Sequence, residues 1–199
     1  MSFIKVFISL LILVFAVSLI TAEYPPKNEE EIPIYPGAER DLAAEEEYQS
    51  QNEGLAEEER AESEIIKIYS VYAPPEKVCE FYIKSLNAKE GFPEEEPDLS
   101  KPGFVAPWYE MEFFEESDFV DQVERGDVIY SGKWVKSCLS QREFWNDGKW
   151  VSSTYFEWNI IYENGDIGQF SISVEDDSFD WYNKKFNEKT KIIINIKRN

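Results

Sequence analysis

The chain has 199 residues, with 40 acidic against 20 basic side chains, a formal net charge of −20 and no histidine. The missing histidine excludes Ser-His-Asp and Cys-His nucleophile systems and every zinc or iron site that needs an imidazole ligand. Because nucleic-acid binding requires a basic face that neutralises phosphates, the acidity argues against a nucleic-acid partner. The length suits one domain with an extension.

Residues 1–22 have the pattern of a secretory signal peptide. Lys5 gives a positive start, residues 6–20 are apolar apart from two serines, and Ala22 ends the stretch before an acidic residue. An apolar run of about 15 residues is short for a membrane span, which needs about 20. We therefore expect cleavage after Ala22 and a periplasmic, cell-surface or extracellular protein. An uncleaved segment is the alternative, and it would be the only membrane contact.

Cys79 and Cys138 are the only cysteines in the chain. In an oxidising compartment they can form a disulfide, which for a loop of this length stabilises by about 4 kcal/mol in the chain-entropy model. The alternative is two separate buried thiols, because free cysteine is among the most buried residue types.

Residues 23–64 form an acidic arm, which contains 15 acidic and three basic side chains. Its few apolar side chains cannot offset the entropy of ordering, so we expect a flexible linker or a solvated helix. A cation-binding or partner-binding arm is the alternative. Within the arm, residues 32–38 combine two isoleucines with prolines and a glycine, which predicts a short edge strand that ends in a turn.

Residues 65–199 are expected to form one domain. Alternating β-branched and aromatic residues predict a strand over 65–73, and apolar side chains at 3.6-residue spacing after Pro75 predict an amphipathic helix over 75–88. A loop over 91–107, a strand over 108–114 and a short helix over 115–124 follow.

From Gly126 onward the pattern predicts strands to the end of the chain. Asn164-Gly165 fits a type I′ hairpin turn, because both of its central residues accept positive φ. The predicted fold is α+β, a mainly antiparallel sheet with one principal amphipathic helix on a face. The predicted strands cover residues 127–130, 133–144, 151–162, 167–175 and 190–197.

Two segments resemble an uncharacterised group of bacterial secreted proteins and lipoproteins. The first is the strand-turn Ile-Pro-Ile-Tyr-Pro-Gly-Ala at 32–38, similar to P-x-Y-P-G-A. The second is the helix that begins at Pro75 and contains Glu-x-Val-x-x-Phe-Tyr-x-x-x-Leu, with Gly91-Phe92 where the group has Gly-Trp. The match covers about 30 residues, since an acidic insertion separates the two motifs. The resemblance implies an exported α+β domain and no particular reaction.

A calcium site is one hypothesis for an acidic exported protein, because calcium prefers oxygen ligands. Asp176, Asp177 and Asp180 cluster on a predicted turn, although the EF-hand spacing is absent. A solvated turn is the alternative, so no cofactor is expected apart from this weak calcium candidate.

Aromatic residues near turns are the candidates for a binding surface. Trp145 and Trp150 flank the turn at 146–148, and Trp181 and Tyr182 follow the acidic turn. Such rings can stack on sugars or pack into a protein partner, and the alternative is ordinary core packing or cross-strand pairing.

The chain also offers carboxylate pairs, such as Glu110 with Glu112, that a glycosidase would need about 5 to 9.5 Å apart. With 40 acidic residues, such pairs are also expected by coincidence. We therefore expect an exported protein that is not an enzyme and that binds a protein partner or a cell-envelope component. The alternatives are a carbohydrate-binding module or a carboxylate-dependent hydrolase acting on an extracellular polymer.

Overall fold

A computed structural model describes residues 24–52, 63–93, 101–119, 123–125 and 128–198. Its centre is a seven-stranded sheet in the order β1-β2-β11-β8-β7-β4-β3, in which every neighbouring pair is antiparallel except β3 and β4. This confirms the α+β fold with a mainly antiparallel sheet. The strands are β1 (Glu39–Arg40), β2 (Ser63–Val71), β3 (Lys89–Glu90), β4 (Gly103–Phe113), β7 (Val151–Ile161), β8 (Ile167–Asp176) and β11 (Thr190–Arg198).

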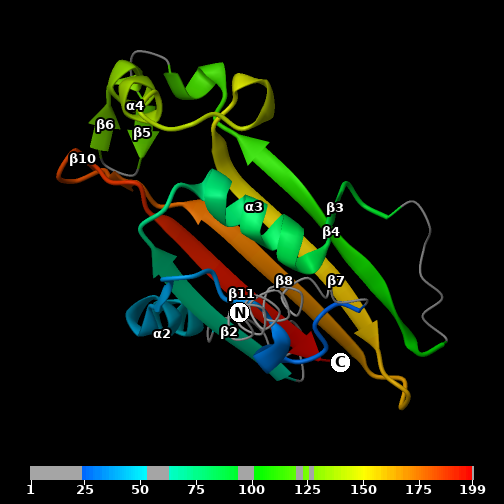
Figure 1. Cartoon of the computed structure of the whole chain (residues 1–199). Helices are drawn as coiled ribbons and strands as arrows, with labels where there is room; N and C mark the ends of the chain where they lie inside the picture. The colour runs from blue at the N-terminus through cyan, green and yellow to red at the C-terminus, as the bar shows by residue number, and fades with distance from the viewer. Residues whose placement is uncertain (1–23, 53–62, 94–100, 120–122, 126–127, 199) are drawn as a thin grey trace, which may run out of the picture.

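Helix α3 (Pro75–Leu86) covers one face of this sheet (Figure 1). Its buried stripe includes Val78, Cys79 and Tyr82, which pack in one cluster with Phe156 and Phe170 of the central strands. Burying a large apolar side chain contributes about 1.5–3 kcal/mol, so this stripe fixes the helix on the sheet. The principal amphipathic helix predicted from the sequence is therefore confirmed.

The helix ends at Leu86, close to the end at residue 88 that the sequence predicts, and its C-cap Asn87 has a left-handed φ of 51°. The Asn87 N–H bonds back to the Ile83 and Lys84 carbonyls, which satisfies groups that the helix end would otherwise leave open.

The N-terminal part of the acidic arm packs on the same face as α3. Ile32 is buried in the main core, the Trp158 Nε1–H donates to the Pro26 carbonyl at 2.8 Å, and the Tyr162 hydroxyl donates to the Lys27 carbonyl at 2.8 Å. The turn predicted within 32–38 is present at residues 36–37, but the short strand is wrong: residues 33–35, after the 3-10 helix η1 (Glu29–Glu31), have no regular structure, and the edge strand is the following β1. Residues 53–62 of the arm lie outside the described residues.

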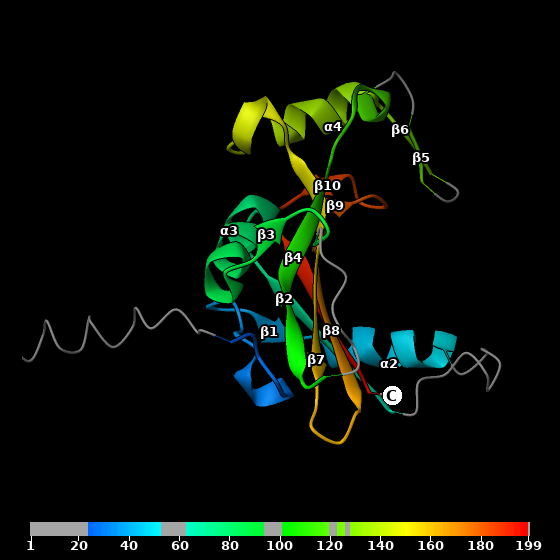
Figure 2. The ribbon, with the colours of Figure 1, turned by 90° about the vertical axis from the view of Figure 1, so that its right-hand side faces the viewer.

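Helix α2 (Leu42–Asn52) lies on the opposite face, so the sheet separates it from α3 (Figure 2). It is held by Glu45, whose carboxylate accepts two hydrogen bonds from Arg40, at 2.8 and 2.9 Å, and one from the Ile68 N–H at 2.9 Å. The Asp41 N–H donates to the Ile68 carbonyl at 2.7 Å. The Glu45 carboxylate therefore acts as an extra acceptor on the β2 edge, next to β1.

A second, smaller cluster lies at one end of the sheet. Helix α4 (Gly132–Leu139) buries Val135, Cys138 and Leu139 against Trp150 and Phe179. The strand predicted over 133–144 is wrong, because these side chains share one helix face at spacings of three and four residues. The remaining elements, most of them in this end lobe, are η3 (Glu116–Phe119), β5 (Val123–Arg125), β6 (Val128–Tyr130), η4 (Asn146–Gly148), β9 (Phe179–Asp180) and β10 (Lys185–Phe186).

Arg142 joins this lobe to the sheet through a buried ionic cluster. Its Nη2 contacts both Glu76 carboxylate oxygens at 2.9 Å, and its Nη1 contacts Asp176 Oδ2 at 2.8 Å. The side chain of Arg142 is 0% exposed, and those of Glu76 and Asp176 are 4% and 3% exposed. Burial raises the pKa of Asp176, and the Arg142 charge opposes that rise. Arg142 is therefore the shared counter-charge of two carboxylates that are almost inaccessible to water.

The predicted signal segment, residues 1–22, lies outside the described residues. Among the residues that are described, no helix is long and apolar enough to cross a membrane.

We expect Arg142→Met to lower the free energy of unfolding by about 3–5 kcal/mol, because it leaves two buried carboxylates without a counter-charge. Urea denaturation at pH 7 measures this loss. Lys77→Met is the control, since the Lys77–Glu143 pair, 2.9 Å apart, is exposed to solvent and should contribute far less than the buried cluster. The triple variant Arg142→Met, Glu76→Gln, Asp176→Asn should recover part of the loss. Equal effects of Arg142→Met and Lys77→Met would contradict the role of the cluster.

Glu45 should make the docking of α2 sensitive to acid. The Arg40 hydrogen bond lowers the pKa of Glu45, with the Ile68 N–H acting in the same direction. A carboxylate with a lowered folded-state pKa stabilises the fold above its unfolded pKa of about 4.3, and this contribution is lost as the pH falls through the folded value. Glu45→Gln should therefore cost about 1–2 kcal/mol at pH 7 and less at pH 3, measured by denaturation at both pH values.

Glu46→Gln, on an exposed neighbour in the same helix, is the matched control for this experiment. A gap between wild type and Glu45→Gln that stays constant from pH 7 to pH 3 would show that the Glu45 charge does not stabilise the fold.

Candidate functional site

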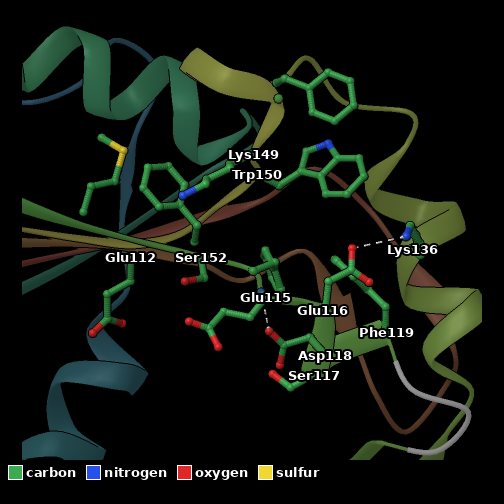
Figure 3. A pocket seen from close by; sticks show the side chains of 15 residues that line it. Glu112, Glu115, Glu116, Ser117, Asp118, Phe119, Lys136, Lys149, Trp150 and Ser152 are labelled. Atoms are coloured by element: carbon green, nitrogen blue, oxygen red, sulfur yellow. Dashed lines mark hydrogen bonds and ion pairs between the residues drawn. The ribbon is translucent and has the colours of Figure 1, made fainter.

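A large cleft lies between the end of β4, the 3-10 helix η3, helix α4 and the segment 144–152 (Figure 3). Its volume is about 1110 Å³, and its lining comes from residues 111–119, from Lys136 and from residues between 144 and 152. The cleft exists because the chain leaves β4 at Phe113, turns through η3 and α4, and returns to the sheet at Val151. We call it the end cleft.

Aromatic rings form one wall of the end cleft. Trp150 is 8% exposed and contacts Phe144 and Phe119, with ring centroids 4.8 and 5.9 Å apart. Phe144 is 56% exposed, which is unusual for a ring that packs on a buried tryptophan. Phe113 and Phe114 complete the wall. This wall offers a ligand apolar area and ring faces.

Two lysines lie over rings of this wall. The Nζ of Lys149 is 5.1 Å from the Phe113 centroid, and that of Lys136 is 5.1 Å from the Phe119 centroid. Such an ammonium group is attracted by the negative face of the ring. Two rings of the wall therefore already contact ammonium groups of the same chain.

Carboxylates line the other side of the cleft. Figure 3 shows Glu112, Glu115 and Asp118 with their oxygens on the side away from Trp150. Glu116 lies 3.7 Å from Lys136, Glu112 accepts from the Ser153 hydroxyl at 2.8 Å, and Asp118 accepts from the Glu115 N–H at 2.8 Å. Four acidic residues face two lysines in the lining, a net charge of −2. The cleft therefore favours a positively charged, partly apolar ligand.

The four aromatic residues predicted from the sequence do not form one surface. Trp150 lines the end cleft, whereas Trp145 packs against the main core. Trp181 stacks on Phe179 with centroids 4.8 Å apart, inside the second cluster. Tyr182 is 84% exposed in the turn between β9 and β10. Trp145, Trp150 and Trp181 thus pack in the two hydrophobic clusters, as the alternative of core packing describes.

The three aspartates proposed for calcium each bind a different partner. Asp176 is buried against Arg142, and Asp177 accepts from Lys189 at 2.6 Å. Asp180 accepts from both the Asn183 N–H and its side-chain amide, and this contact lowers the pKa of Asp180. No group of three or more metal-binding side chains is found within the described part of the chain. The aspartates thus stabilise local structure.

The two cysteines are free thiols in two different clusters, so the disulfide is not formed in the structure. Cys79 donates to the Thr154 hydroxyl at 3.1 Å, and burial raises the pKa of the Cys79 thiol to about 12. This group stays neutral at physiological pH and is not a nucleophile.

A second, polar groove lies on the sheet face that carries α2. Its volume is about 330 Å³. The Tyr155 hydroxyl donates to Glu157 at 3.0 Å, and Lys191 pairs with Glu175 at 2.7 Å, so neighbouring charges are largely satisfied within the protein. The groove is lined by Tyr48, Tyr155, Glu157, Gln169, Ser171, Ser173, Glu175 and Asn195, among others.

Glu110 and Glu112 lie two residues apart on β4, on the face opposite to Tyr109 and Met111, which pack against the main core. Glu143, which follows Arg142 in the chain, pairs with Lys77, and that contact lowers the pKa of Glu143. An acid for glycoside cleavage needs a raised pKa instead.

No known protein family, no curated protein and no solved structure matches this chain. The resemblance to secreted bacterial proteins therefore stays a prediction.

Sequence reasoning missed five residues that provide rings and cations of the end cleft: Phe113, Phe119, Phe144, Lys136 and Lys149. The signal was present as phenylalanines next to acidic residues at 113–116 and 143–144. These segments are about 30 residues apart in the chain, and only α4 and the return to β7 bring them together.

We expect Phe144→Ala to change the free energy of unfolding by less than about 1 kcal/mol, because its ring is largely exposed. Trp150→Ala should lower it by about 3–5 kcal/mol, because it empties a buried site. Urea denaturation of both variants measures the contrast. A loss of the same size in both would show that Phe144 belongs to the core and not to the wall of an open cleft.

Proposed function

We propose that the protein is an exported, non-enzymatic binding protein that holds a basic segment of a partner protein in the end cleft. The single observation that carries this proposal is the combination of an aromatic wall with an acidic opposite side. Lysine and arginine side chains have an apolar stem and a cationic head, and this cleft offers a surface for each part.

The charge of the whole chain acts in the same direction. A net charge of −20 attracts a basic partner over distances near the Debye length, which is about 8 Å at physiological salt. Electrostatic attraction of this kind mainly raises the association rate and selects against acidic partners. The predicted export signal would place such binding in the periplasm, at the cell surface or outside the cell.

Carbohydrate binding is the second candidate, and the polar groove on the α2 face is the observation that favours it. The groove combines two tyrosines with hydroxyl, amide and carboxylate groups. The Glu175 carboxylate of its lining is already paired with Lys191 of the same chain. A neutral sugar, with stacking faces and hydroxyls, has the matching chemistry.

The test uses full-length chain expressed in a bacterial host and purified from the exported fraction, where intact mass reports whether residues 1–22 were removed. The probe is a fluorescent ten-residue peptide that alternates lysine and valine, and its counterpart has glutamate in place of lysine. We expect the lysine peptide to bind with a Kd below about 1 mM, more weakly as salt rises, and the glutamate peptide not to bind. Phe144→Ala should weaken binding about tenfold.

Phe92→Ala is the matched control, because Phe92 is also a largely exposed phenylalanine and lies outside the cleft lining. No binding of the lysine peptide, or equal losses in the two variants, would overturn the proposal. Thermal stabilisation by a neutral glycan that Tyr155→Ala removes and Phe144→Ala leaves intact would favour carbohydrate binding instead.

A further inference from the structure

The two edges of the sheet differ in how their backbone N–H and C=O groups are paired. At the β2 edge, the Ile68 N–H and carbonyl are both taken, by Glu45 and by the Asp41 N–H. At the other edge, β3 pairs with β4 only through Lys89↔Trp108 and Glu90↔Tyr109. In the described part of the chain, no strand pairs with the outer edge of β4 over residues 110–113.

The backbone groups of Met111 point away from the sheet along this open edge. The N–H and C=O of one strand residue point to the same side, and successive residues alternate. Because the Tyr109 carbonyl accepts from the Gly91 N–H at 2.9 Å, on the β3 side, the groups of Met111 also face outward. An extended chain placed beside β4 would therefore find a donor and an acceptor at Met111.

The same stretch of β4 leads into the end cleft. Met111, Glu112 and Phe113 are both edge residues and cleft residues. A strand added at this edge would bring its side chains between the aromatic wall and the acidic side. Strand addition supplies affinity through the backbone and specificity through side-chain pockets.

The charge of the side chains at this edge favours a basic strand over a second copy of this chain. The exposed Glu110 and Glu112 flank Met111, and the chain as a whole carries −20. Two copies that met edge to edge here would bring like charges directly opposite one another, which is unfavourable. A basic strand would instead pair with these carboxylates.

We propose that an extended, basic segment of a partner protein adds to β4 as a further strand at residues 110–113, in line with β3, and places its side chains in the end cleft. This inference rests on the proposed function and adds the binding mode. Exposed sheet edges are commonly protected by lysine, proline or a bulge. This edge has acidic side chains and an open backbone donor at Met111.

The experiment measures binding of the lysine–valine peptide to Met111→Pro. Proline removes the outward N–H and is tolerated at a sheet edge, where that N–H has no ladder partner. We expect at least tenfold weaker binding than for Met111→Ala, which keeps the N–H and loses the same side-chain packing. A peptide with N-methyl groups on alternate amides keeps its charge but cannot pair as a strand, and it should bind the wild-type protein at least tenfold more weakly than its parent.

The N-methylated peptide tests the binding mode even if Met111→Pro does not fold. If it binds as well as its parent while Phe144→Ala still weakens binding, strand addition is overturned and the proposed function stands. If Phe144→Ala has no effect on either peptide, the proposed function fails first. A dimer in solution that Met111→Pro dissociates would show that the occupant is a second copy, and would also overturn the inference.

Discussion

The buried contact of Arg142 with Glu76 and Asp176 is the constraint on which the arrangement of the lobe depends. It joins the first turn of α3, the end of β8 and the segment after α4 at a point that excludes water. The Val151 N–H donates to the same Glu76 at 3.0 Å, so the start of β7 is fixed there too. A buried ionic cluster adds little net stability, because removing its charges from water costs about as much free energy as their attraction returns. It does fix the positions of its members, because leaving one charge unpaired in the interior would strongly destabilise the fold. The end cleft depends on this geometry, since its walls come from either side of Arg142.

The sheet has different coverings on its two faces and different endings at its two edges. α3 and the N-terminal segment cover one face and form the main core, whereas α2 covers only part of the other and leaves a polar groove beside it. The β2 edge is closed by Glu45 and Asp41, and the β4 edge opens into the cleft. The face that carries α3 therefore holds the main core. The polar groove lies on the other face, and the end cleft lies at the end of the sheet.

The proposed binding role rests on the charges and rings of the end cleft, and the other reactive groups are held within the protein. The buried Cys79 stays a neutral thiol, the Asp176 and Glu143 carboxylates are paired with cations, and the rings of the end cleft already hold two lysine ammonium groups. A basic partner would extend contacts that the chain already makes within itself. The strongly acidic composition favours the same kind of partner at longer range.

The amino-acid sequence alone determined the α+β class, the amphipathic helix from Pro75 and the alternation that buries Phe156, Phe170 and Ile194, because these follow from local spacing. It also located the hairpin between β7 and β8, but the predicted type I′ turn is wrong, because Gly165 has a positive φ of 89° and Asn164 does not have a positive φ. It failed where tertiary contacts compete with local preference. The segment 133–144 alternates well enough for a strand, and α4 forms because Val135 and Leu139 reach the same cluster. Residues 24–38 are too polar to fold alone, and they are ordered by Trp158 and Tyr162, which are more than 120 residues away. Only the tertiary structure decided the end cleft and the open β4 edge, since both need segments that are distant in the chain to meet.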